Sequence, residues 1–357
     1  MNSLILQQQE EVIALAQFDI KDAVLKKCLL KEDETVITVP DGVTTIGKDA
    51  LCGLQSVIAV TLPESLKVIN DGAFYGCSSL TSVTLPDGVE RLGSCAFAQC
   101  STLNKIYLDN KLTEIGNSAF WGCTSLESID IPEGVTKIGY NLFGSCLSLI
   151  SVSLPDTVTE LDERAFKECT SLACITLPDS LIKIGNMAFL NCRNLKSVNI
   201  PDRLESIGEK AFFMCESLNE LEIPDGIISV GGDAFSDCVS VTVRSTISGK
   251  PLYKAVTATD GSSAYNFILR NIWDKGGFDF TAQDNYFPAL QDENLQYAIA
   301  FSRLMYRVNL SAAAEEHYLD FLHNNAENAV RYCITQDSAE LLGICKENGL
   351  ITAGNVT

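Results

Sequence analysis

The chain has 357 residues, 46% of them hydrophobic and 20% charged, and its formal net charge is −20. The apolar content excludes a largely disordered protein, and the length suggests about two domains. An acidic surface repels phosphate backbones and anionic lipids, so we expect no nucleic-acid binding and no membrane insertion. The sequence has no apolar run long enough to span a membrane and no signal-peptide pattern. We therefore expect a cytoplasmic protein, with the cell surface, reached by an unrecognised route, as the alternative.

Residues 1–36 predict an N-terminal cap made of a helix and β-structure. Ser3 can cap a helix that runs to about Phe18. Two stretches of β type, 23–30 and 35–39, flank a polar segment and predict a hairpin. This hairpin would cover the first unit of the repetitive region that follows.

Residues 37–243 form nine units of 23 residues without an insertion. Equivalent positions of successive units form columns of identical residues. A phenylalanine column comprises Phe74, Phe97, Phe120, Phe143, Phe166, Phe189, Phe212 and Phe235. A cysteine column comprises Cys77, Cys100, Cys123, Cys146, Cys169, Cys192, Cys215 and Cys238. A fixed period of this kind predicts a solenoid, in which stacked units bury a continuous core.

The unit that begins at Val83 illustrates the predicted local structure. Val83 and Leu85 alternate with polar residues, which predicts a short strand with one buried face. Pro86 ends the strand because it has no N–H group for a ladder hydrogen bond, and Asp87-Gly88 turns the chain.

The repeated pattern I-x-L-P-x-x-V-x-x-I-G-x-x-A-F-x-x-C-x-S-L resembles the BspA-like leucine-rich repeats of bacterial proteins, and it covers residues 37–243. The resemblance implies a right-handed, gently curved β-solenoid with parallel strands on one face. It also implies recognition of a protein or a surface, and no enzymatic activity of the repeats themselves.

One column contains glycine, with only Asn and Asp as substitutes. Its members are Gly47, Asn70, Gly93, Gly116, Gly139, Asp162, Gly185, Gly208 and Gly231. Because Asn and Asp tolerate positive φ better than other residues, we expect a left-handed corner here, not only a need for a small residue.

The cysteine column allows a structural and a chemical interpretation. A linear column cannot converge on one zinc ion, and neighbouring disulfides require an oxidising compartment. Cysteine is among the most buried residue types, so we expect buried, reduced thiols and no metal or cofactor.

An acidic column follows the proline position. It comprises Asp41, Glu64, Asp87, Asn110, Glu133, Asp156, Asp179, Asp202 and Asp225. The functional interpretation of this column is a row of sites for divalent cations. One carboxylate per unit is, however, too few for a calcium site. We expect instead that these residues favour the tight turn after the proline and that their carboxylates face water.

After the repeats, residues 244–263 predict a bridge and residues 264–357 a small helical domain. Asp292, Ser311 and the Asp337/Glu340 box are predicted N-caps, and Gly349 a helix stop. The stretch 329–352 resembles an ankyrin-type helix pair, although the ankyrin turn signature is absent. The alternative is a plain helical cap on the last repeat.

No motif in the chain predicts catalysis. His317 and His323 are six residues apart, which does not place them on one helix face. Ser248-Gly249-Lys250 lacks the spacing of a phosphate-binding loop. We therefore expect no catalytic residues and a non-enzymatic interaction module.

The outward position of each predicted strand is where we expect partner binding. This row comprises Thr38, Thr61, Thr84, Tyr107, Asp130, Ser153, Thr176, Asn199 and Glu222. We predict a footprint centred on Tyr107, Asp130 and Ser153, with Asn199 at its edge, for a neutral or basic protein partner. Two alternatives stay open: a cell-surface adhesin or host-interaction protein, and a small-ligand or enzymatic function in the helical domain.

Overall fold

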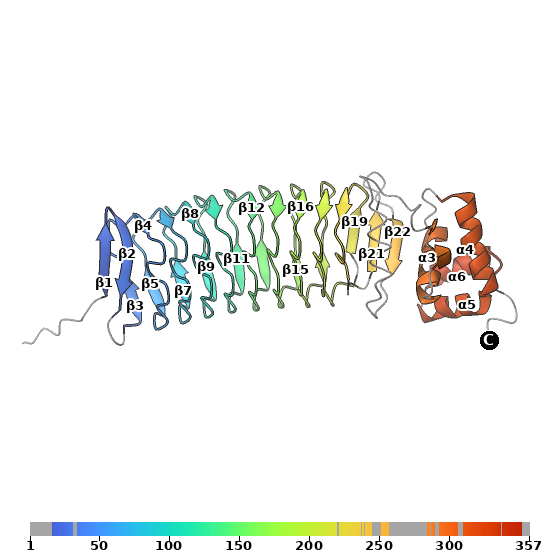
Figure 1. Ribbon diagram of the computed structural model, residues 1–357, viewed down its shortest axis with the longest axis horizontal. Coiled ribbons are helices and arrows are strands. Elements are labelled where there is room, and N and C mark those ends of the chain that lie inside the picture. Colours follow the sequence, from blue (N-terminus) through green and yellow to red (C-terminus); the bar gives the residue numbers. More distant parts are fainter. Residues whose placement is uncertain are drawn as a thin grey trace, which may run out of the picture.

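A computed structural model describes residues 16–30, 34–219, 221–236, 238, 240–244, 251–256, 284–285, 287–289, 293–305, 310–336 and 338–351. A long stack of β-coils is followed by a group of α-helices (Figure 1). The predicted fold is confirmed: the chain forms a β-solenoid of about nine turns, with parallel strands 23 residues apart, and then a small helical domain.

Each coil contributes two short strands, so two rows of parallel strands run along the solenoid. The first row comprises β3 (Val36–Thr38), β5 (Ala59–Thr61), β7 (Ser82–Thr84), β9 (Lys105–Tyr107), β11 (Ser128–Asp130), β13 (Ser151–Ser153), β15 (Cys174–Ile175), β17 (Ser197–Val198) and β19 (Leu221–Pro224). The second row comprises β4 (Thr45–Ile46), β6 (Val68–Ile69), β8 (Arg91–Leu92), β10 (Glu114–Ile115), β12 (Lys137–Ile138), β14 (Glu160–Leu161), β16 (Lys183–Ile184), β18 (Ser206–Ile207) and β20 (Ser229–Val230). Paired residues, such as Ile37 and Val60, occupy the same position of successive units.

Both strand rows are interrupted between coils four and five, counted from the unit that begins at Ile37. One sheet ends at β9 and another at β10, while β11 and β12 start new sheets. The Gly116 N–H donates to the Leu92 carbonyl at 2.8 Å. Within residues 34–219, the equivalent bond from Gly139 is absent. The backbones of coils four and five are therefore less tightly joined along these rows.

The core consists of columns of buried side chains that the repeat aligns. The column phenylalanines stack nearly parallel, with ring centroids 4.8–6.1 Å apart. Each column thiol donates a hydrogen bond of 3.1–3.5 Å to a main-chain carbonyl 26 residues earlier. Cysteine therefore fills a small buried space, and its thiol finds an acceptor in a carbonyl that in most units also accepts a backbone N–H.

The prediction of positive φ in the glycine column is wrong. Positive φ occurs in two other columns: Asp49, Gly72, Cys95, Ser118, Asn141, Arg164, Met187, Lys210 and Asp233, and Gly53, Gly76, Gln99, Gly122, Ser145, Glu168, Asn191 and Met214. The glycine column is instead a place where coils approach closely. A Cβ atom on Gly116 would lie 2.3 Å from the Ser94 nitrogen. Smallness therefore explains the glycine there.

The N-terminal hairpin contains only one of its two predicted strands, 23–30, and pairs it with a different segment. β1 (Gln17–Lys21) and β2 (Val24–Leu29) pair antiparallel through a tight turn at Asp22-Ala23, where both residues have positive φ. β2 then pairs with β4, and β3 joins the first row instead of pairing with β2. Phe18 lies in β1, so the predicted helix does not reach it, and residues 1–15 lie outside the described part.

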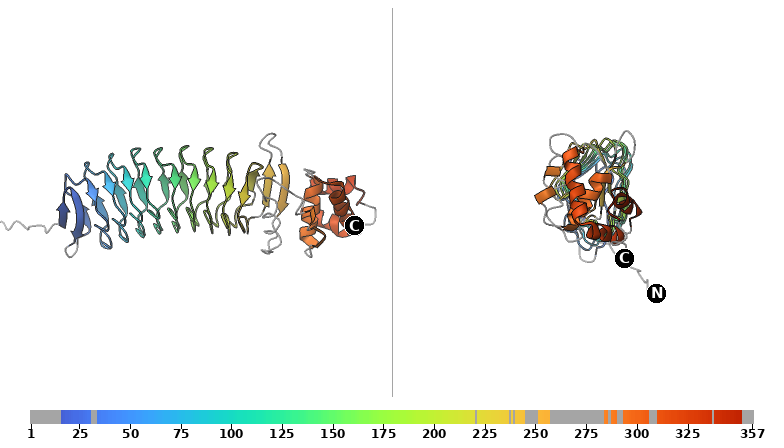
Figure 2. Two further views of the ribbon diagram at one scale, coloured as in Figure 1. Left: turned by 45° about the horizontal axis from the view of Figure 1, so that its top comes forward. Right: turned by 90° about the vertical axis from the view of Figure 1, so that its right-hand side faces the viewer.

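The C-terminal end of the solenoid carries a second hairpin. β21 (Ser240–Arg244) pairs with β19 in parallel and with β22 (Pro251–Val256) antiparallel. The sequence prediction of an irregular bridge over 244–263 missed β22. In two views the helical domain follows these strands at the end of the solenoid (Figure 2).

The helical domain contains α3 (Glu293–Met305), α4 (Ala312–Asn324), α5 (Ala326–Thr335) and α6 (Ala339–Glu347), with a short 3₁₀ turn at Phe287–Ala289. The predicted cap of α4 is confirmed, because Ser311 Oγ accepts from the Ala314 N–H at 3.2 Å. α6 is capped one residue later than predicted, by Ser338, and Asp337 lies outside the described residues. Gly349 has a φ of 69°, as a helix stop requires.

We predict that the cysteine-column thiols react slowly in the native protein. Burial raises the pKa of Cys123 and Cys215 to about 12, so little reactive thiolate forms at neutral pH. Cys52 and Cys174 are exposed and should react fast. Timed alkylation followed by peptide mapping measures the reaction rate of each cysteine. Equal rates for the column cysteines and for the two exposed cysteines would contradict burial of the column.

We predict that Gly116→Ala destabilises the protein by about 1–3 kcal/mol, because the added methyl group meets backbone atoms of the preceding coil. Gly139→Ala is the matched control. Its Cβ would meet only the Asn117 side chain, at 2.9 Å, across the interrupted junction. Urea unfolding should show a clearly smaller loss for Gly139→Ala, and equal losses would refute the close-approach explanation.

Candidate functional site

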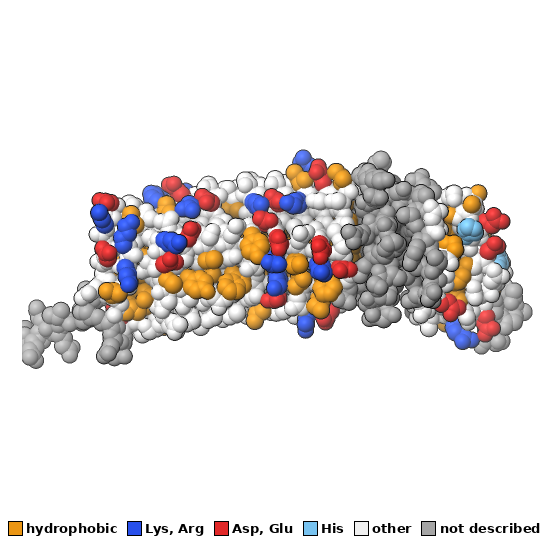
Figure 3. Space-filling model, viewed as in Figure 1, with side chains coloured by type: hydrophobic (Ala, Val, Ile, Leu, Met, Phe, Trp, Pro, Cys, Tyr) orange, Lys and Arg blue, Asp and Glu red, His pale blue; other side chains and the backbone are white. Residues whose placement is uncertain are grey.

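The candidate site lies on the exposed side of the first strand row. Along this row the middle residue of each strand points into the core and its neighbours point outward. Tyr107 is 58% exposed, and Lys105 Nζ lies 4.6 Å from the centre of its ring. Charged side chains of both signs and apolar side chains are interspersed along the visible side of the solenoid (Figure 3).

The first two predicted site residues face each other across the interruption between coils four and five. Tyr107 ends β9, and Asp130 ends the next strand, β11. Asp130 is in turn paired in register with Ser153 on β13. The pKa of Lys105 is raised, mainly by Tyr107 and in smaller part by the negative charge of Asp130. An exposed aromatic ring, a cation and a carboxylate are thus within mutual electrostatic reach.

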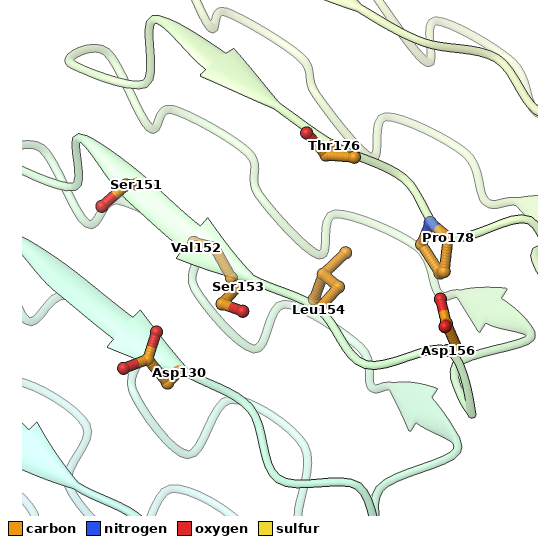
Figure 4. A pocket seen from close by; sticks show the side chains of 8 residues that line it. All are labelled: Asp130, Ser151, Val152, Ser153, Leu154, Asp156, Thr176 and Pro178. Carbon is orange, nitrogen blue, oxygen red and sulfur yellow. The ribbon is translucent and has the colours of Figure 1, made fainter.

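Beyond Ser153 the strand face contains a hollow of about 420 Å³ (Figure 4). It is lined by Asp130, Ser151, Val152, Ser153, Leu154, Asp156, Thr176 and Pro178. β13 is not paired with β15 in the described sheets, and the hollow lies between these two coils. The sequence pattern gave no signal of this opening.

The hollow is acidic and hydroxyl-rich. Its two carboxylates, Asp130 and Asp156, take part in none of the ion pairs within residues 34–219. Its lining includes three hydroxyl groups and no Lys or Arg. Such a lining can accept hydrogen bonds from a cationic group and stabilise its charge.

The charges of the second strand row, by contrast, neutralise one another. Positive and negative residues alternate from coil to coil along Arg91, Glu114, Lys137, Glu160 and Lys183. Arg91 pairs with Glu114 at 3.1 Å. Lys137 and Lys183 both pair with Glu160, at 3.1 Å and 2.6 Å. These cations are therefore engaged on the second row and form no ion pair with the carboxylates of the hollow.

Asn199, the predicted edge of the footprint, forms hydrogen bonds to the backbone of the preceding coil. Its side chain accepts from the Leu177 N–H and donates to the Leu177 carbonyl, both at 2.8 Å. The amide thus satisfies the backbone of the preceding coil next to β15 and β17. Tyr107, Asp130 and Ser153 are brought together in adjacent coils, whereas Asn199 lies two coils beyond Ser153.

Several titratable groups of the helical domain are engaged in internal contacts. Arg303 is fully buried and binds Asp284 through two bonds of 2.9 and 3.0 Å, while the Tyr318 hydroxyl donates to the same carboxylate. The ring nitrogens of His323 contact the carbonyls of Leu319 and Asn348. Among the described residues, no group of three or more His, Cys, Asp or Glu side chains is arranged to hold a metal ion.

Comparison with known proteins identifies the repeats. The model of the BspA type leucine-rich repeat region matches residues 19–150 and 136–250, in six copies. The chain belongs to this family. No functionally curated protein matches it. Within the described residues, no helix is long and apolar enough to cross a bilayer.

Similar solved structures share the repeats. A leucine rich cell surface protein of Faecalibacterium prausnitzii is 26% identical, with a TM-score of 0.40 over 63% of this chain and 85% of that chain. A leucine-rich repeat protein of Bacteroides ovatus is 20% identical, with a TM-score of 0.45 over 66% and 90%. A leucine rich repeat protein of T. pallidum is 27% identical, with a TM-score of 0.43 over 63% and 86%.

We predict that Asn199→Ala lowers the free energy of unfolding by about 1–2 kcal/mol, because the Leu177 N–H and carbonyl lose their partner. Asn194→Ala, at an exposed position in the preceding turn, is the control and should change stability little. Chemical denaturation measures both. A loss no larger than that of the control would mean that the amide does not support the coil.

Proposed function

We propose that the protein is a non-enzymatic protein-interaction module that receives its partner on the first strand row. The proposed footprint comprises Tyr107, Asp130 and Ser153, with Asn199 at its edge. The observation that carries the proposal is the acidic hollow near the exposed Tyr107, whose two carboxylates form no ion pair within residues 34–219. A family of repeat proteins that present extended, rigid surfaces is consistent with this function.

Tyr107 is suited to anchor the partner. Aromatic residues are enriched among the residues that dominate binding energy, because they bury a large area at a low entropy cost. Tyr107 lies in the fourth of the nine units, near the middle of the row, and β9 holds its backbone in the sheet. A partner side chain packed on this ring would exclude water from Asp130, on the next coil.

The partner's chemistry follows from the charges. The net charge of −20 attracts a neutral or basic protein and repels an acidic one. A Lys or Arg side chain of the partner, inserted at Ser153, would place its cation between the carboxylates of Asp130 and Asp156. Binding should therefore weaken as the salt concentration rises.

We keep the cytoplasm and the cell surface as two proposals for the place of action. The cell surface is the alternative, because the Faecalibacterium relative is named a cell surface protein. Fractionation of the native host with an antibody to the solenoid separates the two. Partner binding by the strand face is possible in either place.

We predict that Tyr107→Ala weakens binding of the partner by more than about 1 kcal/mol, and that Asp130→Asn weakens it and reduces its salt dependence. Thr38→Ala, on the first coil of the same row, is the matched control and should bind as the wild type does. Affinity purification with the full chain identifies the partner, and titration of the purified pair measures each variant. Unchanged affinity of the Tyr107→Ala, Asp130→Asn double variant would refute the footprint. Loss of binding on deletion of residues 264–357 would then move the site to the helical domain.

A further inference from the structure

Two cysteines of the helical domain lie in direct contact. Cys333 on α5 and Cys345 on α6 are both fully buried, and their sulfur atoms are 3.6 Å apart. The column thiols of the solenoid point to main-chain carbonyls instead. The repeat pattern does not include this pair, and the contact exists only because α5 and α6 fold back on each other.

We propose that Cys333 and Cys345 form a reversible disulfide, which makes the pair a covalent modification site that fastens α6 to α5. A disulfide has a sulfur–sulfur distance of about 2.05 Å, so the two sulfur atoms must approach by roughly 1.5 Å. Rotation of one or both side chains about χ1 is a movement of that size. The helices that carry the cysteines are already packed together and need not be rearranged.

The two thiols differ in the helix that carries them. Either thiol can donate the hydrogen bond that joins the two sulfur atoms, so this bond does not itself select one cysteine as the thiolate. The thiolate is the species that attacks a disulfide. Cys345 lies on the short helix α6 and is uncovered when that helix opens, so we assign it the first attack and assign Cys333 the second step of the exchange.

The oxidant that the reaction requires is a small-molecule disulfide such as glutathione disulfide. The Cys345 thiolate attacks one sulfur atom of the oxidant, forms a mixed disulfide and releases one glutathione thiolate. The Cys333 thiolate then attacks the Cys345 sulfur, forms the Cys333–Cys345 bond and releases the second glutathione thiolate. Two electrons pass from the cysteines to glutathione disulfide, and the two cysteine protons go to the released thiolates.

Access to the buried pair requires α6 to open. α6 has nine residues, of which only Cys345 is fully buried, and it is the last helix in the described part of the chain. A short peripheral helix of this kind belongs to the part of a protein that unfolds locally at a low free-energy cost. Oxidation should therefore proceed through the opened form, and the finished disulfide should suppress that opening.

The test uses the purified full-length protein, equilibrated with mixtures of reduced and oxidised glutathione and then alkylated under denaturing conditions. Trypsin cleaves after Arg331 and Lys346, so one peptide, 332–346, carries both cysteines. We expect this peptide to lose two hydrogen atoms and to resist alkylation as the mixture becomes more oxidising. Amide hydrogen exchange in α6 should slow at the same time, and reductant should restore the original rate.

Variants separate this pair from other thiols. Cys52→Ser, Cys174→Ser should keep the internal disulfide, because both replaced cysteines are exposed and distant in sequence from the pair. Cys333→Ser should instead leave Cys345 able to form only a mixed disulfide with glutathione. If Cys333→Ser fails to fold, the oxidation state of peptide 332–346 from the wild-type protein alone tests the proposal. A peptide 332–346 that stays fully alkylated while Cys52 and Cys174 acquire glutathione would overturn the proposal.

Discussion

The structure depends on the hydrogen bonding of each coil's backbone to the next coil. Interior amide groups of a solenoid cannot reach water, so each must find a partner in its own coil or in a neighbouring one. The bonds between coils bring them close enough that a Cβ atom at Gly116 would collide with the backbone of the preceding coil. The column cysteines add to this network, because their thiols donate to main-chain carbonyls of the preceding coil. The phenylalanine stack then fills the space that the backbone spacing defines.

The sequence period was sufficient to predict the solenoid, the aligned core and the burial of the column cysteines, because each is a property of every unit. It was not sufficient to locate positive φ, because Met187 and Lys210 adopt it although neither residue type favours it. The close approach at the glycine column depends on the distance between coils, which a single unit does not encode. The hollow beside Ser153 was missed for the same reason, since it results from strands that fail to pair.

The candidate site lies where the regular pattern fails. In coil four, Asp109 replaces the usual proline and accepts from the Lys111 N–H at 3.1 Å, which gives this turn a different geometry. Both strand rows are interrupted directly after this coil. Departures from local regularity tend to occur where a protein has a function besides stability. Tyr107 and Asp130, the first two departures from the threonine of coils one to three, lie on either side of this interruption.

The interruption also changes what binding at this face would require. A partner that contacts both Tyr107 and Asp130 spans two blocks of coils, one ending at coil four and one beginning at coil five, which the strand rows do not join. The affinity of such a partner therefore depends on the spacing between the two blocks. On the turn side the blocks remain joined, since the Phe120 N–H donates to the Leu142 carbonyl at 3.1 Å. The junction therefore has fewer backbone hydrogen bonds on its strand side than on its turn side. A partner that contacts both blocks would add to the bonds that hold the strand side together, and its affinity would include the free energy of holding the blocks at the bound spacing.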